Sequence, residues 1–126
     1  AQDKIYVKSG KSSTYLLLHE LVHKIRSNAG KNLDHRLEEI IAVNTAYKIG
    51  KAAGLQLKVW KYDLPGLINR TLKANNIKPR RLSESEKKLI DKEIVETVQL
   101  FVELLKEKGH SLSEIDWAKT AILILL

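Results

Sequence analysis

Five consecutive residues of this chain have the types and the spacing to bind and activate a metal ion: His19-Glu20-Leu21-Val22-His23. Two histidines four residues apart project from the same face of a helix, about one turn from each other. Both imidazoles can therefore close on one ion, with the carboxylate of Glu20 standing beside it. In such a site Glu20 is not a ligand, because it holds and deprotonates a water molecule whose pKa the metal has already lowered.

The residues before this motif indicate that its helix is largely buried. Tyr15-Leu16-Leu17-Leu18 makes the helix apolar on most of its faces, and a buried helix rarely carries three polar groups inward without a use for them. The chain has no cysteine, so a transition-metal site must use histidine, carboxylate and water. We therefore expect a zinc ion at His19 and His23, with a third protein ligand and one position left for water.

The third ligand should come from a nearby element, and a second predicted helix carries a suitable carboxylate. Glu39 with Ala42 and Ala46 has the spacing E-x-x-A-x-x-x-A. In residues 5–50 the chain resembles the gluzincins, and most of all the compact ImmA/IrrE type, in which a short strand and an HExxH helix precede a helix with this pattern. The resemblance implies a zinc-dependent metallopeptidase with Glu39 as the third ligand, acting on a peptide or on a specific regulatory protein.

Other residues compete for roles at this site. Glu38 and His35 are alternative ligands, and His35, one turn before Glu39 on the same face, could instead orient that carboxylate. Peptide hydrolysis also needs a group that stabilises the tetrahedral oxyanion. The candidates for that role are Tyr47, Tyr62 and His110.

Periodicity and capping residues predict the elements that position these side chains. Residues 4–8 alternate like a short edge strand, and 55–60 like a weaker one. The metal helix follows Ser12, Ser13 or Thr14 and runs to about 28, where Asn28-Ala29-Gly30 breaks it. Further helices are expected at about 33–51 (capped by Asn32 or Asp34), 64–75, 84–108 and after Ser111, several of them beginning at an Asp cap or a Ser-x-x-Glu capping box.

These elements predict a mainly α (α+β) fold: a minimal zincin-like domain with a short edge strand or small sheet, the HExxH helix, the Glu39 helix and a C-terminal helical bundle. With 126 residues the chain should be a single domain, 1–126, with a metal-binding core at 5–50 and a helical part at 62–126. No stretch approaches the ~18 apolar residues of a membrane span. We expect a cytoplasmic protein that does not enter a membrane.

The charge is distributed unevenly, which raises a second functional possibility. Residues 1–82 carry 16 Lys and Arg against 6 Asp and Glu, whereas residues 83–126 carry 6 against 9. The basic half, centred on Lys78, Arg80 and Arg81, could bind nucleic acid or an acidic protein without catalysis, or it could simply be a solvated surface. A third possibility is an inactive zincin-like fold in which zinc is only structural.

Overall fold

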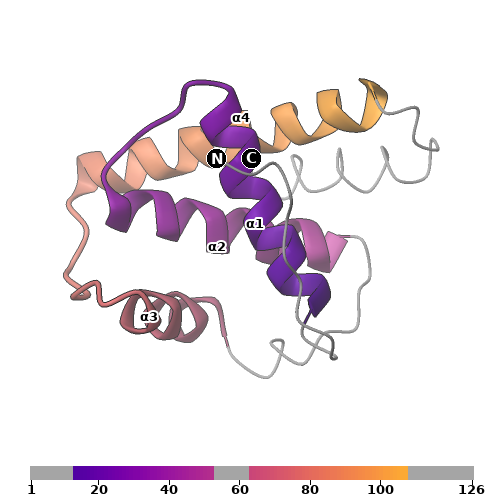
Figure 1. Cartoon of the computed structure of the whole chain (residues 1–126). Coiled ribbons are helices and arrows are strands. Elements are labelled where there is room, and N and C mark those ends of the chain that lie inside the picture. The colour runs from indigo at the N-terminus through magenta and orange to yellow at the C-terminus, as the bar shows by residue number, and fades with distance from the viewer. Residues whose placement is uncertain (1–12, 53–62, 108–126) are drawn as a thin grey trace.

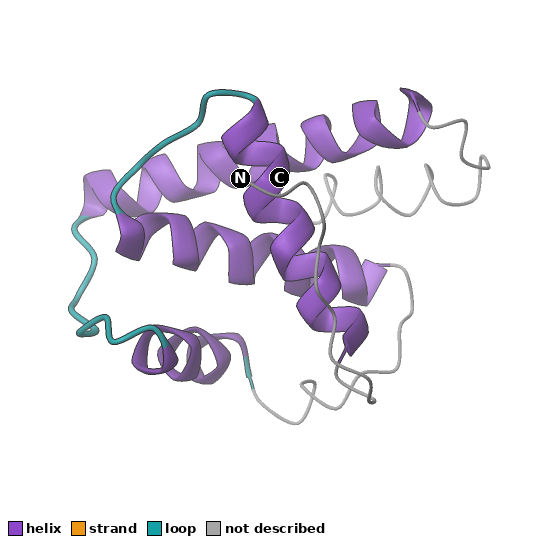
Figure 2. Ribbon diagram, viewed as in Figure 1, coloured by secondary structure: helices purple, strands orange, loops and turns teal. Residues whose placement is uncertain are grey.

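The computed structural model describes residues 13–52 and 63–107, which form four α-helices (Figure 1). They are α1 (Ser13–Asn28), α2 (His35–Ala52), α3 (Leu64–Ala74) and α4 (Glu84–Glu107). This part of the chain contains no strand (Figure 2), so it is mainly helical, as predicted. The strands predicted at 4–8 and 55–60 and the helix predicted after Ser111 lie outside the described residues. None of the four described helices is long and apolar enough to cross a lipid bilayer.

The helices begin at the capping residues that the sequence offered. Asp34, and not Asn32, caps α2, because its carboxylate accepts a hydrogen bond from the backbone N–H of Leu37 at 2.9 Å. Asp63 caps α3 in the same way, at 2.8 Å. At α4, Ser83 and Glu86 form the predicted capping box, in which each side chain accepts a hydrogen bond from the other residue's N–H, at 3.1 and 3.0 Å.

The end of α1 sets the direction in which the chain leaves the metal helix. The N–H of Lys31 donates to the carbonyl of Arg26 at 2.9 Å, and the N–H of Gly30 donates to the carbonyl of Ser27 at 3.0 Å. This is a Schellman motif, and its central residue, Gly30, has the positive φ of 75° that the motif requires and that glycine adopts without steric cost. The chain therefore turns sharply into the short connection that leads back to α2.

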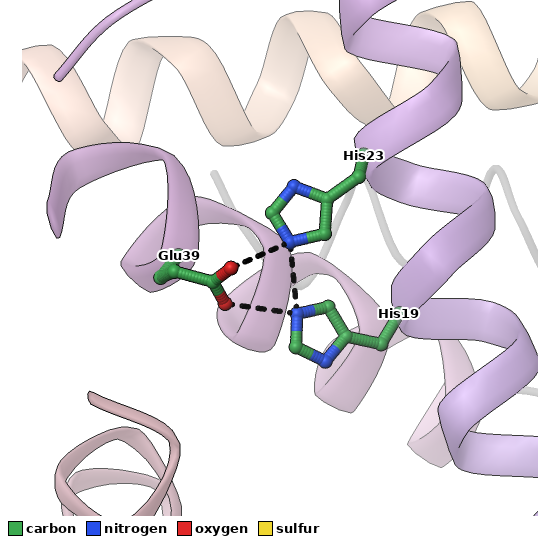
Figure 3. A group of neighbouring side chains, drawn as sticks. All are labelled: His19, His23 and Glu39. Carbon is green, nitrogen blue, oxygen red and sulfur yellow. Dashed lines mark hydrogen bonds and ion pairs between the residues drawn. The ribbon is translucent and has the colours of Figure 1, made fainter. Parts of the chain in front are cut away.

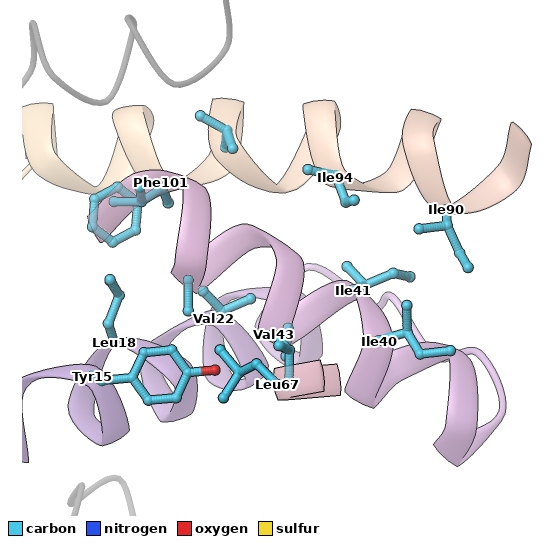
Figure 4. Close-up of a cluster of buried hydrophobic side chains, with 14 of the residues drawn as sticks. Tyr15, Leu18, Val22, Ile40, Ile41, Val43, Leu67, Ile90, Ile94 and Phe101 are labelled. Atoms are coloured by element: carbon cyan, nitrogen blue, oxygen red, sulfur yellow. The ribbon is translucent and has the colours of Figure 1, made fainter. Parts of the chain in front are cut away.

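α2 is the central helix of the described structure. It lies between α3 and α4, and α1 crosses it, so that α2 contacts all three other helices (Figure 1). Its buried residues consequently cover most of its circumference from Arg36 to Ala46, and Ile41, Val43 and Ala46 are fully buried. Side chains from all four helices meet in one apolar core around it (Figure 4).

The apolar residues of α1 are not all buried. Leu18 and Val22 are buried, but Leu17, which belongs to the apolar run before the motif, is 41% exposed. The buried row is Tyr15, Leu18, Val22 and Arg26, because α2 and α4 both pack on this side of α1. In this packing His19 faces Glu39 of α2, whereas Glu20, the next residue of α1, is exposed.

Candidate metal centre

α1 and α2 bring His19, His23 and Glu39 together (Figure 3). The Nε2 atoms of the two histidines are 3.0 Å apart. One carboxylate oxygen of Glu39 lies 3.2 Å from Nε2 of His19, and the other lies 3.1 Å from Nε2 of His23. His19 and Glu39 are buried and His23 is partly buried, and of the three, His23 and Glu39 line a cavity.

These distances fit a metal ion. Tetrahedral zinc with imidazole and carboxylate ligands at about 2.0–2.2 Å separates neighbouring ligand atoms by roughly 3.3 Å. The ligand atoms of the three residues, all within 4.8 Å of one another, already converge to nearly this spacing and can hold a metal ion. Two imidazoles and one carboxylate form a nitrogen-rich set, which suits zinc and its transition-metal neighbours better than Mg²⁺ or Ca²⁺.

The three side chains also interact strongly without a metal. Burial alone would raise the pKa of Glu39, but hydrogen bonds from His19 and His23 and their charges outweigh it and lower that pKa to about 2. Burial disfavours the charged form of His23, yet its hydrogen bond to Glu39 and the nearby carboxylates raise its pKa. In the metal-free protein a proton is therefore favoured at the position that a cation would occupy, and proton and metal compete for the same atoms.

Glu20 lies at the open side of this group. It is exposed, and it lines a cavity of about 390 Å³ together with His23, Glu39 and residues of the α1–α2 connection. A second hollow of about 620 Å³ continues from His23 along the same connection and includes Ser27 and Lys31. The cavity beside His23 and Glu39 thus opens to solvent on the side of Glu20, where a water molecule or a substrate can enter.

Glu38 and His35, the two alternative ligands, lie outside the group of converging ligand atoms. Both carboxylate oxygens of Glu38 accept hydrogen bonds from Arg26, at 2.8 and 2.7 Å, so this carboxylate is already paired. His35 is exposed, and its Nε2 lies 3.8 Å from the nearer oxygen of Glu39. His35 is therefore beside the triad without belonging to the group of converging ligand atoms.

Tyr47, the oxyanion candidate among the described residues, is not brought to this site. Tyr47 lies two turns beyond Glu39 on α2, roughly 12 Å along the helix axis, and packs its ring 5.4 Å from the ammonium of Lys51. Tyr62 and His110 lie outside the described residues. The basic residues of the α3–α4 connection are exposed and lie outside both hollows next to the metal ligands; they are Lys78, Arg80 and Arg81.

Tyr15 is a neighbour of the metal ligands that the sequence reading did not single out. It lies one turn before His19, with the ring centroids 6.0 Å apart, and is only 4% exposed. Burial, and then the charge of Glu39, raise the pKa of its phenol, so the hydroxyl stays protonated. Among the described residues that hydroxyl has no hydrogen-bond partner. The i, i+4 spacing to His19 was the available signal that this ring packs against the ligand.

Searches against protein-family models, curated proteins and solved structures found no match to this chain. Its function must therefore be inferred from the site itself.

Proposed function

We propose that this protein is a zinc-dependent peptidase of the small gluzincin kind, with His19, His23 and Glu39 as zinc ligands and Glu20 as the general base. One observation carries the proposal: the three ligand groups of α1 and α2 converge beside a cavity that Glu20 also lines. The resemblance of the HExxH and E-x-x-A patterns to the ImmA/IrrE type supports the same assignment.

When bound at these residues, zinc supplies a Lewis acid that polarises a carbonyl and lowers the pKa of a coordinated water toward neutrality. The protein's own groups hold the metal and transfer the proton. Glu39 and the two histidines present neutral nitrogen and anionic oxygen donors on buried, well-packed helices, which fixes their geometry. Glu20, exposed at the cavity, can accept a proton from water and later deliver it to the leaving amine.

The open side of the ligand group favours a catalytic role over a structural one. A structural zinc site is closed by a fourth protein ligand, whereas a catalytic site keeps one position for water. Among the described residues only three ligand groups converge, and the nearest further imidazole, His35, is directed at Glu39 from 3.8 Å. A cavity of about 390 Å³ lies beside them.

The substitution Glu20→Gln tests this proposal. The variant should keep stoichiometric zinc, measured by native mass spectrometry, because Glu20 is not a ligand. Its cleavage of an unfolded protein or a peptide library should fall by about 10²–10⁴-fold, the usual contribution of a general base.

A matched control is Glu103→Gln, which removes an exposed carboxylate on α4 that lines neither cavity next to the ligands and should change neither property. Cleavage that persists in Glu20→Gln would remove the general base from the mechanism. A wild-type protein that binds zinc but cleaves nothing, under conditions in which related peptidases act, would favour the structural-zinc alternative.

A further inference from the structure

Arg26 is a fully buried charged side chain one turn beyond His23 on α1. Its guanidinium binds Glu38 of α2 through two hydrogen bonds, from Nε at 2.8 Å and from Nη2 at 2.7 Å. Its third nitrogen, Nη1, donates to Glu93 at 3.1 Å and to Thr97 at 2.9 Å, both on α4. One side chain therefore connects three helices in the core.

The α1–α2 connection joins the same cluster. Glu38 also accepts a hydrogen bond from the backbone N–H of Leu33 at 3.0 Å. Lys31 lies 2.9 Å from Glu96 and 3.6 Å from Glu93 on α4. The loop that separates the two metal-binding helices is thus held at both of its ends by the charges around Arg26.

This cluster determines which carboxylate of α2 faces the histidines. Glu38 and Glu39 are adjacent, so they point about 100° apart around the helix. Turning α2 to bring Glu38 to the histidines would leave the buried guanidinium without its bidentate partner, and an uncompensated buried charge is strongly destabilising. The rotation that satisfies Arg26 is the rotation that directs Glu39 between His19 and His23.

We propose that Arg26 is a positioning residue of the metal centre: by pairing with Glu38 on α2 and Glu93 on α4, it fixes the rotation of α2 at which Glu39 meets the two histidines. The inference rests on the proposed function in that it takes these three residues as the zinc ligands. It adds that the affinity for zinc depends on a guanidinium whose hydrogen bonds go to Glu38, Glu93 and Thr97 and to none of the three ligand residues.

Two variants test the role of Arg26, each first shown to be folded by circular dichroism. Glu38→Gln keeps the size of the partner but removes its charge, and Arg26→Lys keeps the buried charge but cannot span Glu38 and Glu93 together. Each should raise the dissociation constant for zinc by about 10–100-fold, the usual effect of losing an outer partner of a ligand, measured by competition with a chromogenic chelator. The visible spectrum of the Co²⁺-loaded protein should change as well, because it reports the geometry of the ligands.

The control is Val98→Ala, which removes buried methyl groups from α4 and destabilises the fold but removes no charge or hydrogen bond of the cluster. It should leave zinc affinity and the Co²⁺ spectrum unchanged. Unaltered affinity in both folded test variants, or an equal loss in Val98→Ala, would overturn the positioning role while leaving the proposed function intact. A wild-type protein that binds no zinc would overturn the proposed function itself, and the positioning role with it.

Discussion

At the scale of single residues, the identity of the third ligand is the most consequential assignment. Glu39 presents both of its oxygens to the histidine nitrogens at 3.1–3.2 Å, while Glu38 is paired with Arg26. Replacing Glu39 by Gln removes the anionic donor but keeps the side chain's size. We expect Glu39→Gln to lose zinc by more than the roughly 10–100-fold typical of outer partners. Stoichiometric zinc in this variant by native mass spectrometry would show that another residue is the ligand.

The pH dependence of metal binding also follows from single residues. The pKa of Glu39 is about 2, so this carboxylate is ionised throughout the neutral range and releases no proton when metal binds. The pKa of His23 is raised above its ordinary value of 6.5, so below that raised pKa a proton must leave before the nitrogen can bind metal. Zinc affinity should therefore fall on acidification, by about tenfold per pH unit for each proton displaced.

Isothermal titration calorimetry in two buffers of different ionisation enthalpy measures the protons released on zinc binding. Release that grows as the pH falls from 8 to 6 is the expected result. Affinity and proton release that do not change across this range would be incompatible with coordination by His23.

At the scale of elements, the close approach of α1 and α2 depends on small residues. Ala42 lies one turn beyond Glu39 on the same face of α2 and is fully buried. Ala42→Leu would force extra methyl groups into a filled core, which costs about 1–3 kcal/mol of stability, and would separate the two metal-binding helices. We expect a lower midpoint in urea unfolding and weaker zinc binding. Ala74→Leu, at the exposed end of α3, is the control and should change neither.

The elements are also where sequence reasoning succeeded best. Asp63, Ser83 and Glu86 are local signals, because a cap acts within one turn, and the helices begin where these residues predicted. The exposure of Leu17 was not foreseen, since the helix period alone does not say which neighbours will cover which part of an apolar arc. That information belongs to the packing of α1 against α2 and α4.

At the scale of the whole molecule, the cluster around Arg26 was the main feature that the sequence did not reveal. Arg26 contacts Glu93 and Thr97, which lie 67 and 71 positions further along the chain, and no local pattern encodes such a pairing. A signal did exist: Arg26 continues the buried row of Leu18 and Val22, and Glu93 interrupts the apolar face of α4. The positive charge of Arg26 on one buried helix face and the negative charge of Glu93 on another could have suggested a buried ion pair. The pairing of His19 with His23, by contrast, followed from their spacing on one helix, and Glu39 was expected from the resemblance of its E-x-x-A pattern to the gluzincins.

A crystal structure of the zinc-loaded protein, with anomalous data collected at the zinc absorption edge, tests the central claim most directly. We predict one strong anomalous peak about 2.0–2.2 Å from Nε2 of His19, Nε2 of His23 and a carboxylate oxygen of Glu39, with a water molecule as the fourth ligand on the side of Glu20. A peak elsewhere, or a site closed by a fourth protein ligand, would contradict the assignment of this site as a catalytic zinc centre.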